Sequence, residues 1–185
     1  MSKELEKDIE KVLITEEQLK ERVYEIAQAM DAYYGEQEVV LVCILKGAVT
    51  FFSDLVRAVS FPVQFDFMCV SSYGSGTESS GRAKIIKDLS VDIAGKNVLI
   101  VEDILDSGNT LDALVKLLLS RNPKDIKLCC LLDKPERRVK PIKPDFGGFQ
   151  IPDEFVVGYG LDYNEQYRQL PYVGVVKRCV YEKNE

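Results

Sequence analysis

VLIVEDILDSGNTL, residues 98–111, predicts a buried strand that turns directly into a helix. Its first residues are apolar and mostly β-branched, which is typical of a strand covered on both faces in a parallel sheet. Glu102 and Asp103, together called the acid pair, follow at the carboxyl end of this strand. The small polar turn DSGNT, residues 106–110, then leads into a helix predicted to reach about residue 121. Because ligands of open α/β sheets bind beyond the carboxyl ends of the strands, this segment also predicts where a site lies.

The acid pair and the turn after it suit the chemistry of a sugar phosphate. Adjacent carboxylates accept hydrogen bonds from sugar hydroxyls and hold Mg²⁺ indirectly. The N–H groups of residues 106–110 lie at a predicted helix N-terminus, where the helix dipole and free donors stabilise a phosphate. Gly108 permits close approach of the backbone, and Ser107 and Thr110 add hydroxyl donors. A plain cap and turn is the simpler alternative, because such residues often follow a strand without binding anything. The ordered combination favours the sugar-phosphate site.

Strand and helix patterns alternate on both sides of this segment. Apolar runs at residues 39–45 and 126–132 predict two further buried strands. A capping box at Thr15 opens a predicted helix that extends to about residue 34, and a second helix is predicted over residues 48–59. Strands that alternate with helices indicate βαβ units and therefore a mostly parallel sheet.

A hairpin and a C-terminal region complete the predicted elements. Residues 63–71 and 85–89 predict two strands joined by the Gly/Ser-rich residues 71–84, which we expect to form a long mobile loop. Residues 134–152 are rich in Pro, Lys and Gly and predict a loop. Short strands are predicted near the C-terminus, at residues 155–160 and 172–177.

Composition excludes several kinds of chemistry. The chain has 185 residues, no histidine and a net charge of −6. Without histidine, Ser-His-Asp and Cys-His nucleophiles and histidine-ligated metal sites are excluded. Neither a Walker A loop nor G-x-G-x-x-G occurs, which disfavours binding of nucleoside triphosphates and dinucleotides. With 24 basic against 30 acidic residues, we expect neither nucleic acid nor a membrane as a partner.

The cysteines and the N-terminus predict a cytoplasmic protein. Most of the 5 cysteines lie in apolar runs, such as LVCIL and LCCLL, and no C-x-x-C pair occurs. Buried thiols in a reducing compartment explain this pattern better than disulfides do. The charged start MSKELEKDIEK is unlike a signal peptide, and no apolar run approaches the roughly 20 residues of a membrane helix.

Residues 98–111 resemble the signature of type I phosphoribosyltransferases, and other segments resemble the hypoxanthine-guanine branch of that family. These segments are LKGA (45–48), SSYG (71–74), LDKPERR (132–138) and IPDEFVVGYGLDYNEQYRQLPYVGVV (151–176). The matches run from about residue 10 to about residue 178, so they cover nearly the whole chain.

The resemblance implies the α/β fold of that family. Its mostly parallel central sheet is flanked by helices, with a long flexible hairpin loop and a small hood built from N- and C-terminal segments. We therefore expect a single domain over residues 1–185, with a core at about residues 36–150. The hood would come from about residues 1–14 and 151–185.

The resemblance also implies roles for the acid pair and the turn. Glu102 and Asp103 would meet the ribose hydroxyls and Mg²⁺-bound waters, and Asp162 would hold a second Mg²⁺. Asp106 would act as the general base beside N7 of a purine. The 5′-phosphate would be wrapped by the turn: Asp106, Ser107, Gly108, Asn109 and Thr110. Ile104, close before the turn, is also expected to bind substrate. Asn109 departs from the family, which often has a basic residue there, and we expect this to tune affinity only.

For the leaving pyrophosphate, the resemblance implies a loop at Lys46 and Gly47, with a cis peptide bond between these residues. Arg168 would contact the same group. The hairpin loop would close over the site and bring Ser72 and Tyr73 to it. Without the resemblance, a glycine that starts a helix and a surface arginine are the simpler interpretations.

For the base, the resemblance implies that Lys134 hydrogen-bonds the purine O6, that Phe155 stacks on the ring and that the Val156 backbone contacts its edge. A solvated lysine and two core residues of a strand are the alternatives.

The implied reaction moves ribose 5-phosphate from 5-phosphoribosyl-1-pyrophosphate to hypoxanthine or guanine, giving IMP or GMP and pyrophosphate, with Mg²⁺ and an oxocarbenium-like transition state. An adenine or xanthine enzyme, a regulator that keeps this fold and binds RNA, and a purely structural protein are the alternatives. The O6 donor disfavours adenine, and the low pI of about 4.9 disfavours RNA. The family also implies a homodimer or homotetramer.

Overall fold

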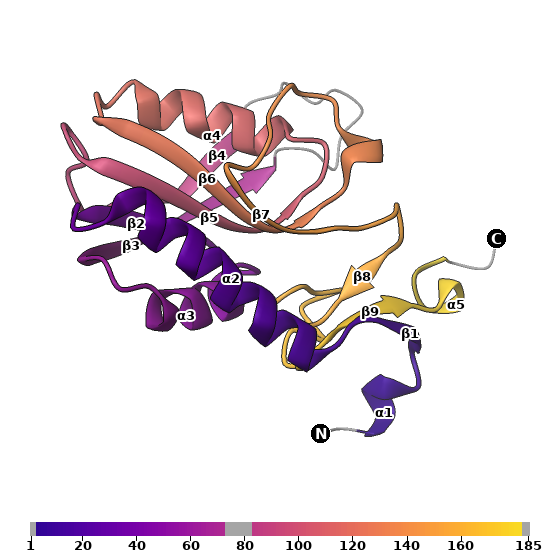
Figure 1. The fold of residues 1–185 in the computed structure, drawn as a ribbon. Coiled ribbons are helices and arrows are strands. Elements are labelled where there is room, and N and C mark those ends of the chain that lie inside the picture. The colour runs from indigo at the N-terminus through magenta and orange to yellow at the C-terminus, as the bar shows by residue number, and fades with distance from the viewer. Residues whose placement is uncertain (1–2, 73–82, 183–185) are drawn as a thin grey trace.

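The computed structural model describes residues 3–72 and 83–182, and its centre is a six-stranded sheet of order β4-β3-β2-β5-β6-β7 (Figure 1). The strands are β2 (Val39–Leu45), β3 (Val63–Ser72), β4 (Ala83–Lys87), β5 (Asn97–Leu105), β6 (Asp125–Asp133) and β7 (Phe146–Gln150). Every neighbouring pair is parallel except β3 and β4, which form an antiparallel hairpin. The predicted mostly parallel sheet and the predicted hairpin are confirmed.

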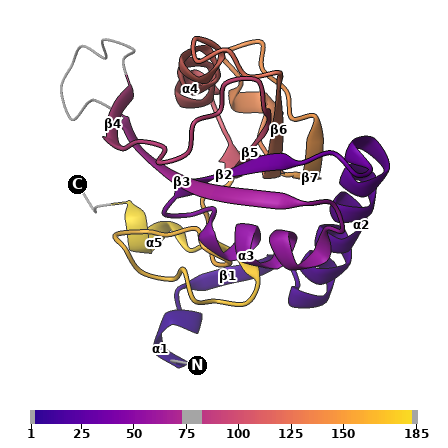
Figure 2. The same ribbon diagram turned by 90° about the vertical axis from the view of Figure 1, so that its left-hand side faces the viewer.

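Helices cover both faces of this sheet, as Figures 1 and 2 show. Helices α2 (Glu16–Tyr34) and α3 (Val49–Ala58) pack on one face, and α4 (Asn109–Leu119) packs on the other. Side chains of a strand point alternately to its two faces, so successive residues of β2 enter different cores. Leu41 and Cys43 pack with α2 and α3, whereas Val40 and Val42 pack with α4.

Helix α2 begins at the predicted capping box. The Thr15 hydroxyl accepts a hydrogen bond from the Gln18 amide at 3.3 Å, and the Gln18 side chain accepts one from the Thr15 amide at 2.9 Å. The helix ends at Gly35, whose positive φ of 58° is a conformation that glycine adopts at low cost.

A second, smaller sheet joins the two ends of the chain. Strands β1 (Ile9–Ile14), β9 (Val173–Val176) and β8 (Val156–Val157) pair antiparallel in that order, beside the short helices α1 (Lys3–Glu6) and α5 (Arg178–Tyr181). This sheet combines N- and C-terminal segments, as the fold class predicted for the hood. The domain boundaries assigned to core and hood stay a prediction.

The structure adds elements that the sequence patterns missed. Residues 134–152 were predicted as a loop, but they contain the 3-10 helix η1 (Pro135–Arg137) and the edge strand β7. The sequence of β7 is FGGFQ, and its two glycines weaken the strand signal. Parallel pairing with β6 supplies the stabilisation that local propensity lacks. The predicted long loop lies mostly at residues 73–82, outside the described residues.

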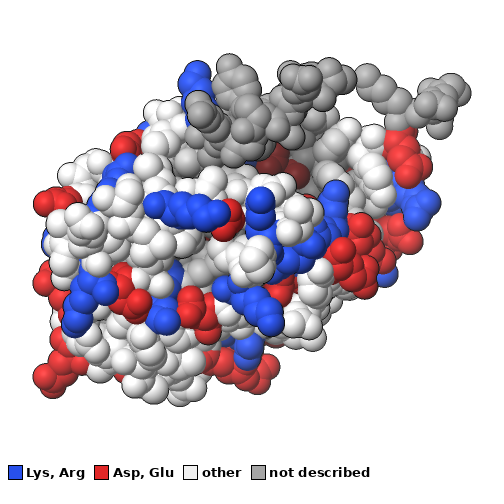
Figure 3. Space-filling view, turned by 90° about the horizontal axis from the view of Figure 1, so that it is seen from above, with Lys and Arg blue, Asp and Glu red and all other residues white. Residues whose placement is uncertain are grey.

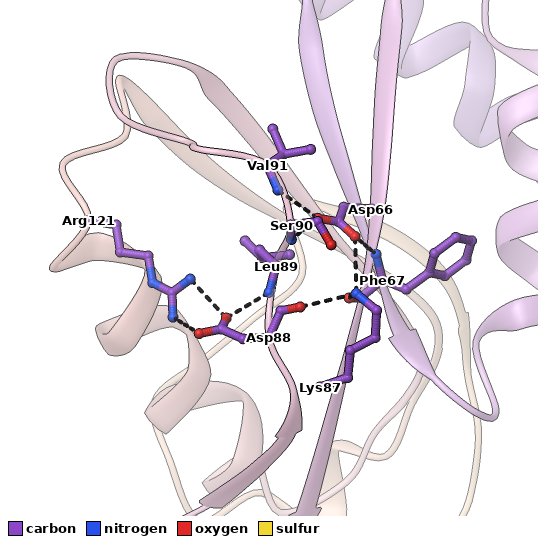
Figure 4. Close-up of polar contacts among 8 residues, drawn as sticks. All are labelled: Asp66, Phe67, Lys87, Asp88, Leu89, Ser90, Val91 and Arg121. Carbon is purple, nitrogen blue, oxygen red and sulfur yellow. Dashed lines mark hydrogen bonds and ion pairs between the residues drawn. The ribbon is translucent and has the colours of Figure 1, made fainter.

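The base of the β3–β4 hairpin is tied by a buried carboxylate, as Figure 4 shows. Asp66 is 6% exposed and accepts hydrogen bonds from the backbone amides of Phe67, Ser90 and Val91 and from the Lys87 ammonium. Burial raises the pKa of Asp66, but the hydrogen bonds from these donors lower it by more, so the net shift is downward.

We expect Asp66→Asn to lower the free energy of unfolding at pH 7 by about 1–3 kcal/mol, because the amide cannot replace an ionised acceptor of several buried donors. Because the pKa of Asp66 is lower in the folded state, its ionised form stabilises the fold at pH values above the unfolded pKa of about 3.9. This stabilisation is lost as the pH falls through the folded pKa. Denaturant unfolding of the variant and the parent at pH 7 and near pH 3 measures this. The exposed Glu36→Gln, which also removes one acidic charge, is the control. A difference that does not shrink in acid would contradict the assignment.

Candidate active site

A cavity of about 460 Å³ lies beyond the carboxyl ends of β2 and β5. Its walls come from the loop after β2, the end of β5, the turn into α4 and the segment between β8 and β9. Most of the predicted site residues line it: Lys46, Gly47, Glu102, Asp103, Ile104, Asp106, Ser107, Gly108, Thr110, Asp162 and Arg168. Because β2 and β5 are parallel neighbours, their ends bring residues from distant parts of the sequence to one edge of the sheet.

Gly47 lies against the acid pair. The α-carbon of Gly47 lies so close to the Asp103 carboxylate that a Cβ atom there would overlap Oδ2. The loop after β2 also contains a cis peptide bond, but at Leu45–Lys46 and not at the predicted Lys46–Gly47. Neither bond precedes a proline, so residue type does not distinguish the two positions.

The acid pair is held without a cationic partner. The Glu102 carboxylate accepts a bond from the Asp103 amide at 3.2 Å, and the Asp103 carboxylate accepts one from the Ile104 amide at 2.7 Å. Neither acid takes part in an ion pair with another described residue. Burial raises the pKa of Glu102, and the neighbouring Asp103 charge raises it further; burial also raises the pKa of Asp103. Two carboxylates in such surroundings favour an incoming cation or hydroxyl donors.

The turn at residues 106–110 leaves backbone donors free. Gly108 is the N-cap of α4, has a φ of 81° and offers no side-chain acceptor to the first turn. The amide of Asn109 has only a long bond of 3.4 Å to the Ser107 hydroxyl. Unsatisfied N–H groups at a helix N-terminus form an anion site. The geometry therefore fits the predicted phosphate turn.

Arg138 holds this turn in place, a role that the sequence analysis missed. Its guanidinium donates to the carbonyls of Asp106 at 2.9 Å and Leu105 at 3.1 Å and pairs with Asp133. Its side chain is 15% exposed, so these bonds are largely shielded from water. The doubled arginine in LDKPERR was the available signal, but a motif does not show which backbone groups a side chain contacts.

Asp106 presents one free carboxylate oxygen. Oδ2 lies 3.2 Å from Arg137, which also lies 3.6 Å from Asp153. Oδ1 is buried and has no hydrogen-bond partner among the described residues. A buried acceptor without a partner in the protein is suited to a donor on a ligand.

The residues predicted to read the base lie outside the cavity walls. Lys134 is 5% exposed and donates to the Glu154 carbonyl at 2.6 Å, and burial lowers its pKa. Phe155 is 38% exposed, and one face of its ring stacks on Tyr181 with centroids 4.9 Å apart. Val156 is buried in β8. The structure thus groups them at the edge between β6 and the small sheet.

Three predicted residues have other positions. Asn109 is exposed at the start of α4. Ser72 ends β3, and Tyr73 lies outside the described residues.

The three carboxylates predicted as metal ligands do not form one compact metal site. Among residues 3–72 and 83–182, no three Asp, Glu, Cys or His side chains are grouped closely enough to hold an ion. Asp162 is instead paired with Arg168 at 2.9 Å. The acid pair nevertheless fits a hydrated divalent cation, because it combines oxygen donors with uncompensated charge.

Comparison with known proteins agrees with this geometry. The model of the phosphoribosyl transferase domain matches residues 13–164. Over 175 residues the chain is 51% identical to the hypoxanthine-guanine phosphoribosyltransferase of Bacillus subtilis, and the match covers 95% of this chain and 97% of that protein. It is 50% identical over 176 residues to the bifunctional protein TilS/HprT of Listeria innocua, of which it covers 27%. The crystal structure of a hypoxanthine phosphoribosyltransferase from Staphylococcus aureus superposes with a TM-score of 0.95 at 46% identity, covering 99% of this chain and 100% of that one.

We expect Glu102→Gln to raise the free energy of unfolding at pH 8 by about 1 kcal/mol in buffer without divalent cations. The folded pKa of Glu102 is raised, so the protonated form stabilises the fold below the unfolded pKa, and this stability is lost as the pH rises through the folded pKa. The advantage of the variant should therefore disappear as the pH falls towards about 4. Chemical denaturation over this range measures it, with the exposed Glu21→Gln as control. A variant less stable than the parent at pH 8 would contradict the electrostatic description.

Proposed function

The chain belongs to the phosphoribosyltransferase family, and we propose on this basis that it transfers ribose 5-phosphate from 5-phosphoribosyl-1-pyrophosphate to hypoxanthine or guanine. The products are IMP or GMP and pyrophosphate. One observation carries the proposal: the acid pair, the phosphate turn and the Lys46–Gly47 loop line a single cavity. A sugar phosphate with an anionic leaving group needs these three kinds of contact at once.

The described residues have complementary roles in this reaction. The free amides of residues 106–110 hold the 5′-phosphate, and the acid pair accepts hydrogen bonds from the ribose hydroxyls. This fixes C1′ between the base and the leaving group, and such positioning supplies much of the rate. As N9 of the base attacks C1′, the free Oδ1 of Asp106 accepts the proton from N7. Lys46 and Arg168 stabilise the departing pyrophosphate.

We propose Mg²⁺ as the cofactor. The acid pair would hold it through water, with Asp162 near a second ion, and the bound metal supplies charge neutralisation for the leaving group. The raised pKa values of the acid pair support this assignment, because a cation removes the cost of burying both charges.

The residues between β6 and the small sheet are proposed to select the base. The Lys134 ammonium, now bonded to the Glu154 carbonyl, would donate to the purine O6. Adenine has an amino donor at this position, so it could not accept this hydrogen bond from the ammonium. Phe155 is partly exposed and would stack on the ring, while the Val156 backbone would contact its edge. Xanthine differs at C2, which these contacts do not reach, and remains the second candidate base.

The surface supports small molecules as partners. On the face drawn in Figure 3, the described Lys and Arg side chains are interspersed with Asp and Glu, and they form no continuous basic stripe there. An RNA-binding regulator would need such a stripe. No helix in the described part of the chain is both long and apolar enough to cross a bilayer.

We further propose self-association and a cytoplasmic location. Phe52, Phe65 and Phe67 form an aromatic cluster between α3 and β3, in which Phe65 is 53% exposed, and Val49 at the start of α3 is 44% exposed. Exposed apolar patches of this kind are typical of subunit interfaces. All five cysteines are free thiols, which suits a reducing compartment.

Two assignments extend to segments near the site. Ser72 and Tyr73 are proposed to close over the leaving group, and the sheet of β1, β8 and β9 is proposed as a hood over a core of about residues 36–150. A lid that excludes water would protect the ribosyl cation from hydrolysis.

A steady-state assay with 5-phosphoribosyl-1-pyrophosphate, Mg²⁺ and four bases tests the function directly. We expect nucleotide formation with hypoxanthine and guanine, little with adenine, and loss of turnover when a chelator removes Mg²⁺. Filter binding to RNA over a range of salt concentrations provides the comparison. Tight, salt-sensitive RNA binding together with no nucleotide formation would support the regulatory alternative instead.

We expect Asp106→Asn to lower kcat by about 10²-fold or more, because the amide cannot accept the N7 proton. Affinity for 5-phosphoribosyl-1-pyrophosphate should change little, since the phosphate is held by backbone amides. Single-turnover rates and calorimetric titration with the pyrophosphate substrate separate the two effects. Turnover equal to that of the parent would remove Asp106 from the mechanism.

A further inference from the structure

Glu165 occupies a turn position that disfavours its residue type. Tyr163 and Gln166 exchange backbone hydrogen bonds of 3.2 and 3.0 Å, so Asn164 and Glu165 form a tight hairpin turn between them. Both central residues have positive φ, 50° and 61°, as in a type I′ turn. Glycine is strongly preferred at the second central position of that turn. A glutamate in this conformation costs free energy. Local backbone strain of this kind often occurs at functional sites, so the contacts of the Glu165 side chain are of interest.

The Glu165 side chain contacts the cations proposed to bind pyrophosphate. Oε1 lies 3.0 Å from the Lys46 ammonium, and Oε2 lies 3.2 Å from the Arg168 guanidinium. These two contacts hold the pKa of Glu165 below its usual value, and the contact with Lys46 has the larger effect. The side chain is 63% exposed, so packing in a core does not explain its presence. The carboxylate thus presents one oxygen to each of two cations that belong to different segments of the chain.

The Arg168 guanidinium has a hydrogen-bond donor that neither Glu165 nor another described residue uses. Its guanidinium donates to the Gly160 carbonyl at 2.8 Å and pairs with Asp162 at 2.9 Å, and the side chain is 26% exposed. Its Nε atom is buried and lacks a hydrogen-bond partner in the described part of the structure. A buried cationic donor without an acceptor has an unmet hydrogen bond, which an anionic oxygen would satisfy.

We propose that Glu165 is an internal stand-in for the pyrophosphate group: in the ligand-free protein its carboxylate neutralises Lys46 and Arg168, and the incoming pyrophosphate displaces it. This inference rests on the proposed function, because it takes these two cations as the leaving-group site. Displacement makes the carboxylate a competitor of every ligand with a pyrophosphate group. Glu165 therefore weakens binding of the substrate and speeds release of the pyrophosphate product.

The sign of a substitution effect distinguishes this role from a structural one. If Glu165 only holds Lys46 and Arg168 in place, its loss frees both side chains and weakens anion binding. If it competes, its loss strengthens anion binding. Exposed ion pairs of this kind are weak, so removal of the competitor should tighten binding by about two- to fivefold.

Calorimetric titration of the full-length protein with magnesium pyrophosphate tests the proposal. We expect Glu165→Gln to lower the Kd about two- to fivefold, and stopped-flow displacement to show slower pyrophosphate release. Glu165→Gly should tighten binding as well while relieving the turn, so it tests the same idea with a different backbone cost. Glu25→Gln, which removes the exposed partner of Arg22 on α2, is the matched control for loss of one acidic charge.

Two further variants separate failure of this inference from failure of the proposed function. Lys46→Ala and Arg168→Gln should each weaken pyrophosphate binding if these residues form the leaving-group site. Unchanged affinity in both would overturn that assignment and the proposed function with it. Weaker binding in both, together with an unchanged or higher Kd in the two Glu165 variants, would overturn only the stand-in role.

Discussion

The close contact between the acid pair and the loop after β2 is the constraint on which the site depends. The Asp103 side chain, near the end of β5, lies against the α-carbon of Gly47, in space that any larger residue at position 47 would fill. This contact exists because β2 and β5 are adjacent and parallel, so their carboxyl ends share one edge of the sheet. The acid pair and the loop after β2 are therefore brought together by neighbouring strands, and the sheet register sets their separation.

Other parts of the chain hold this arrangement from outside. Arg138, from the segment after β6, binds the carbonyls of Leu105 and Asp106, where β5 meets the turn of residues 106–110. Arg168 comes from the segment between β8 and β9, so the small sheet places a cation over a site that the large sheet supplies with acids. The segment between β8 and β9 thus contributes to the charge pattern of the site.

Local signals in the sequence were sufficient for most strands of the central sheet and for the acid pair. Continuous apolar runs identify β2, β5 and β6, and the residues of the phosphate turn are consecutive, so their proximity needs no tertiary information. Contacts between distant segments were not predictable in this way. The pairing of Arg137 with Asp106 and that of Glu165 with Lys46 depend on how separate loops meet. Strand β7 was missed for the same reason, since FGGFQ becomes a strand only through its pairing with β6.

The cavity contains two separate groups of charged side chains, the acid pair and the cations Lys46 and Arg168. The acid pair forms no ion pair with another described residue, and burial raises the pKa values of both carboxyls, with the Asp103 charge adding to the rise at Glu102. Lys46 and Arg168 also line the cavity but are neutralised by Glu165 and Asp162. If the acid pair formed ion pairs with Lys46 and Arg168, the charges of all four groups would be neutralised within the protein and would no longer favour a charged ligand. The fold keeps the acid pair apart from these cations, and the proposed substrate, a polyanion with a divalent cation, would contact both groups at once. This separation explains how a chain with a net charge of −6 binds an anionic substrate at a site rich in carboxylates.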